Sequence, residues 1–235
     1  MNFAGLPERL ADIQGEIARR LAAGGWSHRV TIVAVTKGFG PEAVRAAVAA
    51  GLADVGENRV QEALEKMSQV PDIAATWHLI GHLQRNKAKL VPGRFALVHS
   101  VDSLELGEEL ARRAAAAGAR QRVLVQVNLA GEEQKSGCAP EEAPALVRQV
   151  AVLESLALEG LMTMAPLTDE VEIQRRTFRG LRQLRDALQE EEKVWLPNLS
   201  MGMSADYATA VAEGATVIRL GTVLFGLRET GKRAP

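Results

Sequence analysis

Lys37 is the first residue whose type and position suggest chemistry. It ends a short β-branched run at 31–37 and is followed by Gly38, so a strand and a turn are expected to meet at this side chain. Where water is partly excluded, the pKa of an ammonium group falls, and the neutral amine can form a Schiff base with an aldehyde. A lysine at the end of a strand can equally face the solvent, and the local sequence leaves both interpretations open.

Two glycine-containing segments near the end of the chain could bind a phosphate group. Gly221 and Thr222 follow an apolar run, and the segment 198–202 contains Ser200 beside Gly202. Glycine lets backbone N–H groups approach phosphate oxygens, and serine and threonine add hydroxyl donors. An ordinary turn has the same composition, so this interpretation also stays open at the level of the local sequence.

The segment Trp77–Lys89 carries two histidines, His78 and His82, four residues apart. On a helix this spacing could place two metal ligands on one face, but Gly81 and the alternating apolar residues indicate a strand and a turn. No HExxH pattern is present. We therefore expect no metal site, and we expect His78 to pack or to form hydrogen bonds near the strands.

The sulfur-containing side chains are weaker candidates. Cys138, the one cysteine of the chain, lies in the polar stretch 131–140, where a surface thiol is expected rather than a nucleophile. Four methionines flank the ends of two expected strands: Met162, Met164, Met201 and Met203. They could line a flat cofactor, although methionine more often fills a core.

These side chains would be positioned by a regular alternation of strands and helices. An amphipathic helix is expected at 6–21, before the first strand. Strand-like runs follow at 31–37, 54–57, 76–81, 95–101, 122–129, 156–164, 198–202 and 216–221, and helical segments separate them. Such alternation predicts an α/β fold, a single (β/α)₈ TIM-type barrel over residues 1–235 with an extra N-terminal helix. A doubly wound open sheet is the alternative if the strand count is off by one or two.

The composition excludes several classes of protein. The 235 residues are 47% hydrophobic and 24% charged, so a substantial core is expected. The formal net charge is −1 and there is no basic stripe, so no nucleic-acid partner is expected. No apolar stretch reaches the ~18 residues of a membrane span, and the N-terminus lacks the apolar core of a signal peptide. A single cysteine rules out an intramolecular disulfide. We therefore expect a cytoplasmic protein.

Seven separated segments resemble the pyridoxal phosphate homeostasis protein family. They are AVTKG at 34–38, GENRVQE at 56–62, WHLIGHLQRNK at 77–87, VQVNLAGEEQKSG at 125–137, GLMTM at 160–164, LSMGMSAD at 199–206 and IRLGTVLFG at 218–226. They follow one another in order over most of the chain. Such a set is far more specific than a lone lysine or a lone glycine loop.

The resemblance implies a barrel like the N-terminal domain of alanine racemase, with bound pyridoxal 5′-phosphate (PLP). Lys37 would carry the Schiff base, and Arg219 would face the pyridine nitrogen. The other PLP-binding residues that the resemblance implies are Asn58 and Met164 near the ring, and Ser200, Met201, Gly202, Gly221 and Thr222 at the phosphate.

An arginine at the ring nitrogen has a consequence for catalysis. A protonated guanidinium only donates hydrogen bonds, so the pyridine stays unprotonated and becomes a poorer electron sink. The racemases that this barrel resembles add a β-rich domain and a catalytic tyrosine from a partner subunit. This chain ends at Pro235, and its one tyrosine, Tyr207, is expected in a surface or packing role. We therefore expect no catalytic residues.

The leading hypothesis is a monomeric PLP-binding protein of cofactor homeostasis that binds, buffers or delivers PLP. Apo forms of PLP-dependent enzymes, or amino acids, are its expected further partners. A racemase-like enzyme acting on amino acids is the first alternative, and it would need an acid–base residue opposite Lys37. A barrel aldolase that uses Lys37 on a sugar phosphate is the second.

Overall fold

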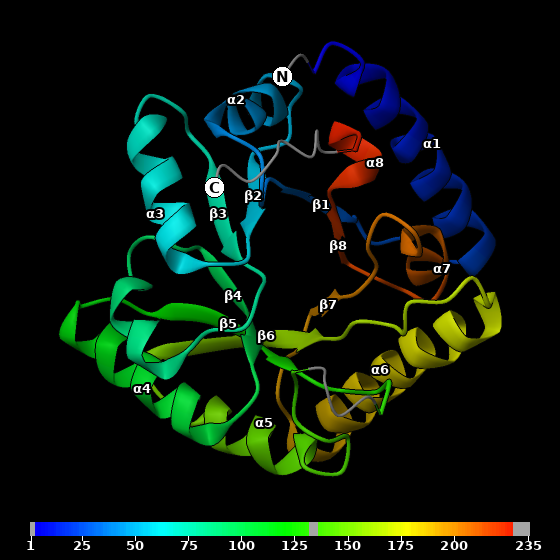
Figure 1. Ribbon diagram of the computed structural model, residues 1–235. Coiled ribbons are helices and arrows are strands. Elements are labelled where there is room, and N and C mark those ends of the chain that lie inside the picture. Colours follow the sequence, from blue (N-terminus) through cyan, green and yellow to red (C-terminus); the bar gives the residue numbers. More distant parts are fainter. Residues whose placement is uncertain (1–2, 132–135, 228–235) are drawn as a thin grey trace.

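A closed ring of parallel strands forms the centre of the molecule (Figure 1). The computed structural model describes residues 3–131 and 136–227. Within those ranges the strands are β1 (Thr31–Val35), β2 (Asp54–Glu57), β3 (Thr76–Leu79), β4 (Leu97–Val101), β5 (Gln121–Gln126), β6 (Leu156–Met162), β7 (Asn198–Ser200) and β8 (Val217–Leu220). Each pairs with the next, and β8 pairs with β1, where Thr31 lies opposite Val217. The predicted barrel is confirmed, and the open sheet is wrong.

Helices surround the strands on the outside of the ring (Figure 1). They are α1 (Leu6–Gly24), α2 (Pro41–Ala49), α3 (Val60–Gln69), α4 (Leu104–Ala116), α5 (Ala143–Ala151), α6 (Val171–Glu192), α7 (Tyr207–Ala212) and α8 (Thr222–Phe225). The segment after β3, which we expected to be α-helical, forms instead the 3₁₀-helix η1 (Arg85–Leu90). With six residues, η1 is longer than most 3₁₀-helices, which seldom exceed ~4 residues. No helix in the described ranges has the length and apolar character needed to cross a membrane.

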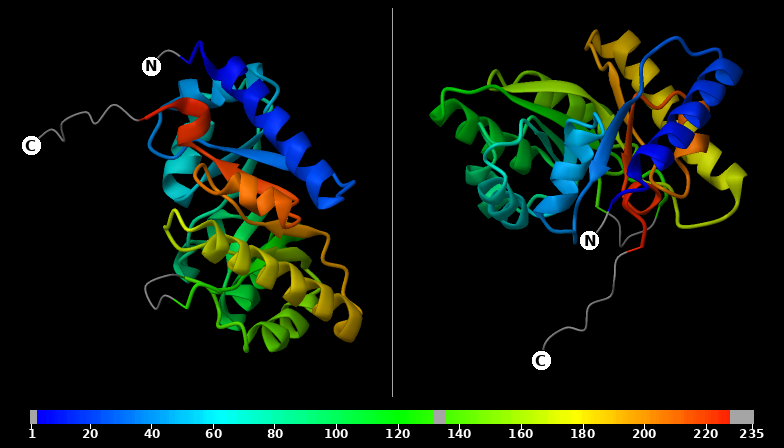
Figure 2. Two further views of the ribbon diagram at one scale, coloured as in Figure 1. Left: turned by 90° about the vertical axis from the view of Figure 1, so that its right-hand side faces the viewer. Right: turned by 90° about the horizontal axis from the view of Figure 1, so that it is seen from above.

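The extra N-terminal helix lies against the last two helices of the barrel, α7 and α8 (Figure 2). Its apolar stripe of Leu6, Leu10, Ile13 and Ile17 is buried, as the spacing of three and four residues predicts. The helix ends at Gly25, whose φ of 69° is a left-handed conformation that glycine adopts without strain. Helix α1 thereby covers the seam where the first and last strands meet.

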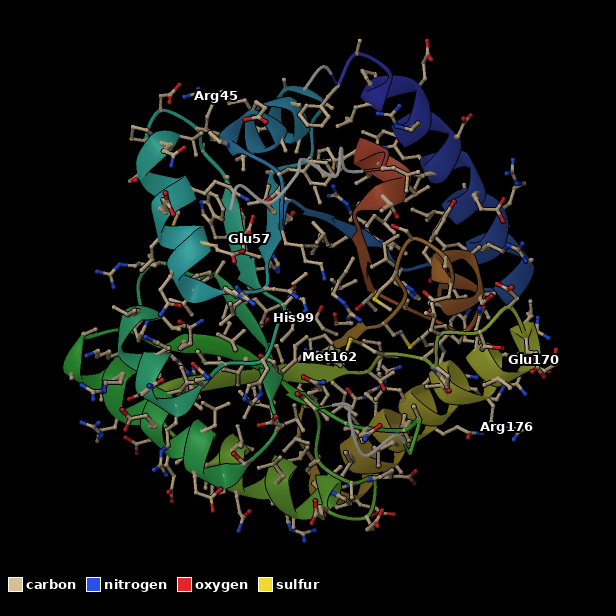
Figure 3. The ribbon with its side chains drawn as sticks, in the orientation of Figure 1. Arg45, Glu57, His99, Met162, Glu170 and Arg176 are labelled. Carbon is tan, nitrogen blue, oxygen red and sulfur yellow. The ribbon has the colours of Figure 1, made fainter. Side chains whose placement is uncertain are left out.

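The barrel has two hydrophobic regions because successive strand residues point to opposite faces. Outward-facing residues such as Val98 and Leu161 belong to the large core between the strands and the helices. Inward-facing Leu97, Leu124 and Met162 form a small separate cluster inside the ring. Figure 3 shows His99 and Met162 near the middle of the ring, so part of the barrel interior is polar.

Candidate functional site

The strand ends and the loops that follow them surround a pocket of about 390 Å³. Lys37 and Arg219 both line it, one after β1 and the other on β8. Its walls are partly apolar, with Val35, Ile80 and Met164 among the lining side chains. The carboxyl end of the strands is where barrel proteins place their chemistry. The position of the pocket therefore agrees with the expected location of the site.

Lys37 lies in the tight turn that follows β1, and its side chain is half-buried. The turn continues through Gly38, whose φ of 73° favours glycine, and the Phe39 N–H donates to the Thr36 carbonyl at 3.0 Å. This geometry turns the chain sharply at the strand end. The amine is thereby placed at the mouth of the barrel, as its position in the sequence predicts.

The Lys37 turn is anchored from outside the barrel by a buried ion pair. Lys66 of α3 pairs with Glu57 at the end of β2, and both side chains are almost completely buried. Lys66 Nζ also donates to the Thr36 carbonyl oxygen at 2.8 Å, and the Thr36 hydroxyl donates to Glu57 Oε1 at 2.6 Å. Figure 3 shows Glu57 beside α3. The carbonyl immediately before Lys37 is thus held by a charged donor.

Arg219 lies at the floor of the pocket and is only 4% exposed. Its Nη1 donates to the Ser200 carbonyl at 2.9 Å and to the Ser200 hydroxyl at 2.6 Å, and Nη2 donates to the Thr163 carbonyl at 2.9 Å. Burial lowers the pKa of Arg219 to about 10, and the charge of Asp206 acts in the opposite direction. The guanidinium is therefore a fixed, positively charged donor at neutral pH.

The third feature of the pocket is a group of hydroxyls and backbone N–H groups at the start of α8 and in the loop before α7. Gly221, Thr222 and Ser204 all line the pocket. The Ser204 hydroxyl accepts from the Gly221 N–H at 3.1 Å and from the Val223 N–H at 3.3 Å. Backbone N–H groups together with hydroxyls are a usual arrangement for phosphate binding. Ser204 was missed in the sequence. It lies in the loop after β7, and since barrel proteins place their sites in such loops, that position would have favoured it over Ser200.

Three residues that we expected at the phosphate do not line this pocket. The Ser200 side chain is fully buried inside the barrel, where its hydroxyl contacts Arg219 and lies 2.8 Å from His99 Nδ1. Met201 is fully buried in the large core. Gly202 has a φ of +94°, and a Cβ built on it would lie 2.6 Å from the Ala210 Cβ, so its close approach to α7 explains the glycine. A phosphate contact of these residues stays a prediction.

Asn58 and Met164 line the pocket, as do His82 and Gln126, which sequence reasoning did not select. Gly81 lets the backbone of Asn58 approach, because a Cβ on Gly81 would lie 2.5 Å from the Asn58 carbonyl oxygen. The half-exposed His82 has its Nδ1 3.4 Å from Asp102 Oδ2. These positions come from a strand end, in the case of Gln126, and from loops, and their side chains converge only when the barrel closes, so their spacing in the sequence gave no signal.

The predicted surface location of Cys138 is wrong. Cys138 is 6% exposed and forms a parallel β-bridge with Val127, because the loop folds back along β5. Burial raises the pKa of the thiol to about 11, and Glu142 and Asp102 act in the same direction. A thiol with that pKa is a poor nucleophile at neutral pH.

The remaining candidates have structural surroundings. His78 forms hydrogen bonds inside the barrel, as predicted, with its Nδ1 2.9 Å from His99 Nε2. Tyr207 begins α7 and packs against the large core, which confirms its predicted packing role. Within the described residues, no group of three or more His, Cys, Asp or Glu side chains is arranged to hold a metal ion.

The sequence matches the family described as alanine racemase, N-terminal domain, over residues 16–229. Two similar proteins are both named pyridoxal phosphate homeostasis protein. The one from Aquifex aeolicus (strain VF5) is 42% identical over 223 residues, which cover 94% of this chain and 98% of the relative. The one from Pseudomonas aeruginosa is 42% identical over 230 residues, which cover 97% of this chain and 98% of the relative.

Solved structures show the same fold. PipY of Synechococcus elongatus PCC7942, solved without PLP, superposes with a TM-score of 0.85 at 39% identity and covers 94% of this chain and 100% of its own. With PLP bound, the same protein superposes with a TM-score of 0.83 at 38% identity. An alanine racemase of Clostridium difficile 630 reaches 0.73 at 18% identity, over 93% of this chain and 58% of that chain. At that identity the likeness supports the fold alone.

Proposed function

Because the chain belongs to the pyridoxal phosphate homeostasis proteins, a family built on the alanine racemase N-terminal barrel, we propose that it binds PLP as a Schiff base on Lys37. The observation that carries the proposal is a shared pocket, in which the Lys37 amine, the buried Arg219 guanidinium and the donors at Gly221 and Ser204 all take part. The PLP-bound structure of the PipY protein supports the same choice of cofactor.

The residues of the pocket fit the three chemical parts of PLP. The amine of Lys37 suits the aldehyde, and the apolar walls that include Ile80 and Met164 suit a flat ring. The N–H groups of Gly221 and Val223, with the hydroxyls of Ser204 and Thr222, suit a phosphate dianion. A pocket of about 390 Å³ falls within the ordinary range for small cofactors.

Each part of the chain then has a defined task. When bound, PLP supplies an aldehyde that condenses with amines and a ring that can accept electron density. Arg219 would supply only hydrogens to a ring nitrogen held beside it, which would keep that nitrogen unprotonated and the ring a weak electron sink. Lys66 and Glu57 hold the turn that carries Lys37. This arrangement suits binding and release of the cofactor better than proton abstraction from a substrate.

We propose that the protein therefore buffers or delivers PLP, with weak catalysis or none. The acceptors would be apo forms of PLP-dependent enzymes, or free amino acids that condense with the cofactor. We propose further that residues 1–235 form one domain that acts as a monomer in the cytoplasm. The single cysteine, which leaves no intramolecular disulfide to protect, is consistent with a reducing compartment.

Borohydride reduction tests the binding mode. Protein loaded with PLP is reduced, digested and analysed by mass spectrometry, and we expect the added mass on Lys37. Lys37→Ala should lose the modification and the absorption of the bound cofactor, whereas Lys89→Ala, which removes an exposed lysine of η1, should keep both. Modification at another lysine, or none, contradicts the proposal.

A racemase-like activity is the second candidate, and one observation favours it. His82 lines the same pocket as Lys37 and lies beside Asp102, so an acid–base group is present there. Exchange of the α-proton of amino acids in deuterated water discriminates between the two functions. Exchange that depends on Lys37 and is lost in His82→Ala would favour the enzyme, and exchange no faster than with free PLP would favour the carrier.

A further inference from the structure

The inside of the barrel is divided into an apolar and a polar half. Strands β4, β5 and β6 supply the apolar half through Leu97, Leu124 and Met162. The polar half consists of Asp54, His78, His99, Ser200 and Arg219, which come from β2, β3, β4, β7 and β8. Burying polar side chains inside a small parallel barrel costs free energy unless each forms a hydrogen bond.

The polar residues form one unbroken chain of hydrogen bonds. Arg219 Nη1 lies 2.6 Å from the Ser200 hydroxyl, which lies 2.8 Å from His99 Nδ1. His99 Nε2 lies 2.9 Å from His78 Nδ1, and His78 Nε2 lies 2.9 Å from Asp54 Oδ1. Arg219 lines the pocket at one end, and the Asp54 side chain is 34% exposed at the other. The chain therefore runs through the barrel from the pocket to the amino end of β2.

The Asp54 end fixes the direction of the bonds in this chain when each ring carries a single proton. Arg219 can only donate, so the Ser200 oxygen accepts from it and the Ser200 hydrogen turns to His99 Nδ1. His99 then carries its proton on Nε2 and donates to His78, which in turn donates to Asp54. An ionised carboxylate can only accept, so Asp54 imposes the same direction from its end. Reversing the bond between the two rings would set the lone pairs of His78 Nε2 and Asp54 against each other. The Ser200 oxygen has two lone pairs, so the direction of its bond to His99 follows from Nδ1 being an acceptor.

We propose that His99 is a positioning residue for Arg219. Its Nδ1 takes the Ser200 hydrogen, so a lone pair of Ser200 faces the guanidinium and holds it below the pocket. With Nδ1 protonated, or absent, the Ser200 hydrogen would lose this acceptor, so the hydroxyl could rotate and its lone pair would no longer be held toward Arg219. The proposal rests on the proposed function only in that the held guanidinium is the group that faces PLP.

The surroundings of His99 keep the ring neutral, as this role requires. His99 is completely buried, and burial lowers its pKa well below the usual value. His78, Arg219 and Arg122 lower it further by charge. A neutral ring has one donor and one acceptor nitrogen, which is what the two neighbours of His99 demand.

The first measurement needs no cofactor. In protein labelled with ¹⁵N-histidine, the nitrogen shifts report which ring nitrogen carries the proton. We expect His99 to carry a single proton, on Nε2, with its signals assigned by elimination through single His→Gln variants of the other three histidines. A His99 ring that carries its proton on Nδ1, or on both nitrogens at pH 7, would overturn the proposal.

Two isosteric variants separate positioning from general packing. In His99→Asn the amide oxygen takes the place of Nδ1 and can still accept from Ser200. In His99→Gln the amide nitrogen takes the place of Nε2, and the acceptor for Ser200 is lost. Both variants replace a buried ring with a smaller polar group, so similar losses of stability are expected, whereas only His99→Gln should release Arg219.

The readouts are the side-chain N–H signals of Arg219 and the affinity for PLP. The Arg219 signals, identified by their loss in Arg219→Lys, should stay resolved in His99→Asn and broaden in His99→Gln. The Kd for PLP should rise about tenfold in His99→Gln, the effect of one hydrogen bond to a charged group, and less than about threefold in His99→Asn. Met162→Leu, in the apolar half, should leave both readouts as in the unaltered protein.

Equal behaviour of the Asn and Gln variants in both readouts would refute a role for the Nδ1 acceptor. Should neither variant fold, the histidine shifts of the unaltered protein still decide the direction of the chain. If PLP does not bind to the unaltered protein, the proposed function fails, while the nitrogen shifts and the Arg219 signals still test the positioning role. The two failures are thus distinguishable.

Discussion

Removing the Lys66 amine should lower the free energy of unfolding and at the same time loosen the turn that carries Lys37. The Lys66 and Glu57 side chains are 8% and 0% exposed, and Glu57 Oε2 has no hydrogen-bond partner in the described residues. In Lys66→Met the aliphatic stem is kept, but a carboxylate is left buried without its cation. Breaking a buried pair in this way costs about 3–5 kcal/mol, a large part of the ~5–15 kcal/mol stability of an ordinary domain.

Urea unfolding followed by circular dichroism measures this loss, with Lys89→Met as the matched control on an exposed lysine. The control should change the free energy of unfolding by less than about 0.5 kcal/mol. The double variant Glu57→Gln/Lys66→Met should recover much of the stability, because no unpaired charge remains. It should still bind PLP more weakly than the unaltered protein, because the Thr36 carbonyl has lost its charged donor. A loss below about 1 kcal/mol in Lys66→Met would refute the reasoning that the pair is buried and coupled.

Three further predictions follow from single positions. Gly202→Ala should destabilise the fold by about 3 kcal/mol in the same urea assay, because a positive φ and contact with Ala210 combine. Gly51→Ala is the control, since Gly51 has a φ of +85° with open space around it, and it should cost only about 1 kcal/mol. Equal losses would contradict the contact argument. Cys138, with a pKa of about 11, should react with iodoacetamide at pH 8 far more slowly in folded than in urea-unfolded protein, and similar rates by mass spectrometry would show that the thiol is accessible. Because the pKa of His99 is lowered in the folded state, the unfolded chain binds its proton first, so the free energy of unfolding should fall by about 2 kcal/mol from pH 7 to pH 5. His99→Asn should remove that part of the pH dependence, and an unchanged slope would contradict it.

The barrel could be predicted because its signal is local and repeated. Buried parallel strands such as 31–35 read as β-branched runs, and each is followed by a helical segment. Pro41 begins α2 as the sequence predicts, since a proline in the first turn gives up no hydrogen bond. The exception is the segment 85–90, where an α-helix was expected and a 3₁₀-helix forms. Over six residues the pattern of apolar positions cannot distinguish the two kinds of helix.

The site could be predicted only in part, because it depends on which face of a strand each residue occupies. Lys37, Gly221 and Thr222 lie past strand ends and line the pocket; that position made them candidates, and the family resemblance assigned them to PLP. Ser200 and Ser204 are four residues apart in one motif, and only the closed barrel shows that the first points inside the ring and the second lines the pocket. A one-residue change of register would exchange such faces, and the sequence does not fix the register.

The buried polar chain was beyond prediction for a related reason. Asp54, His78 and His99 stand in three strands separated by whole helices, and nothing in their local sequence indicates a common interior. The fold of Cys138 onto Val127 likewise depends on how a loop returns to its own strand. Both features are set by pairing across the barrel, which local propensities do not record.

The hydroxyl of Ser204 is the acceptor for the backbone amides of Gly221 and Val223. If a phosphate accepted from these two amides and then left, the hydroxyl could take its place. The amides would then not be left without a hydrogen-bond partner. Cofactor binding of the proposed kind would be offset in part by the loss of these two bonds, which would favour exchange of the cofactor over permanent retention.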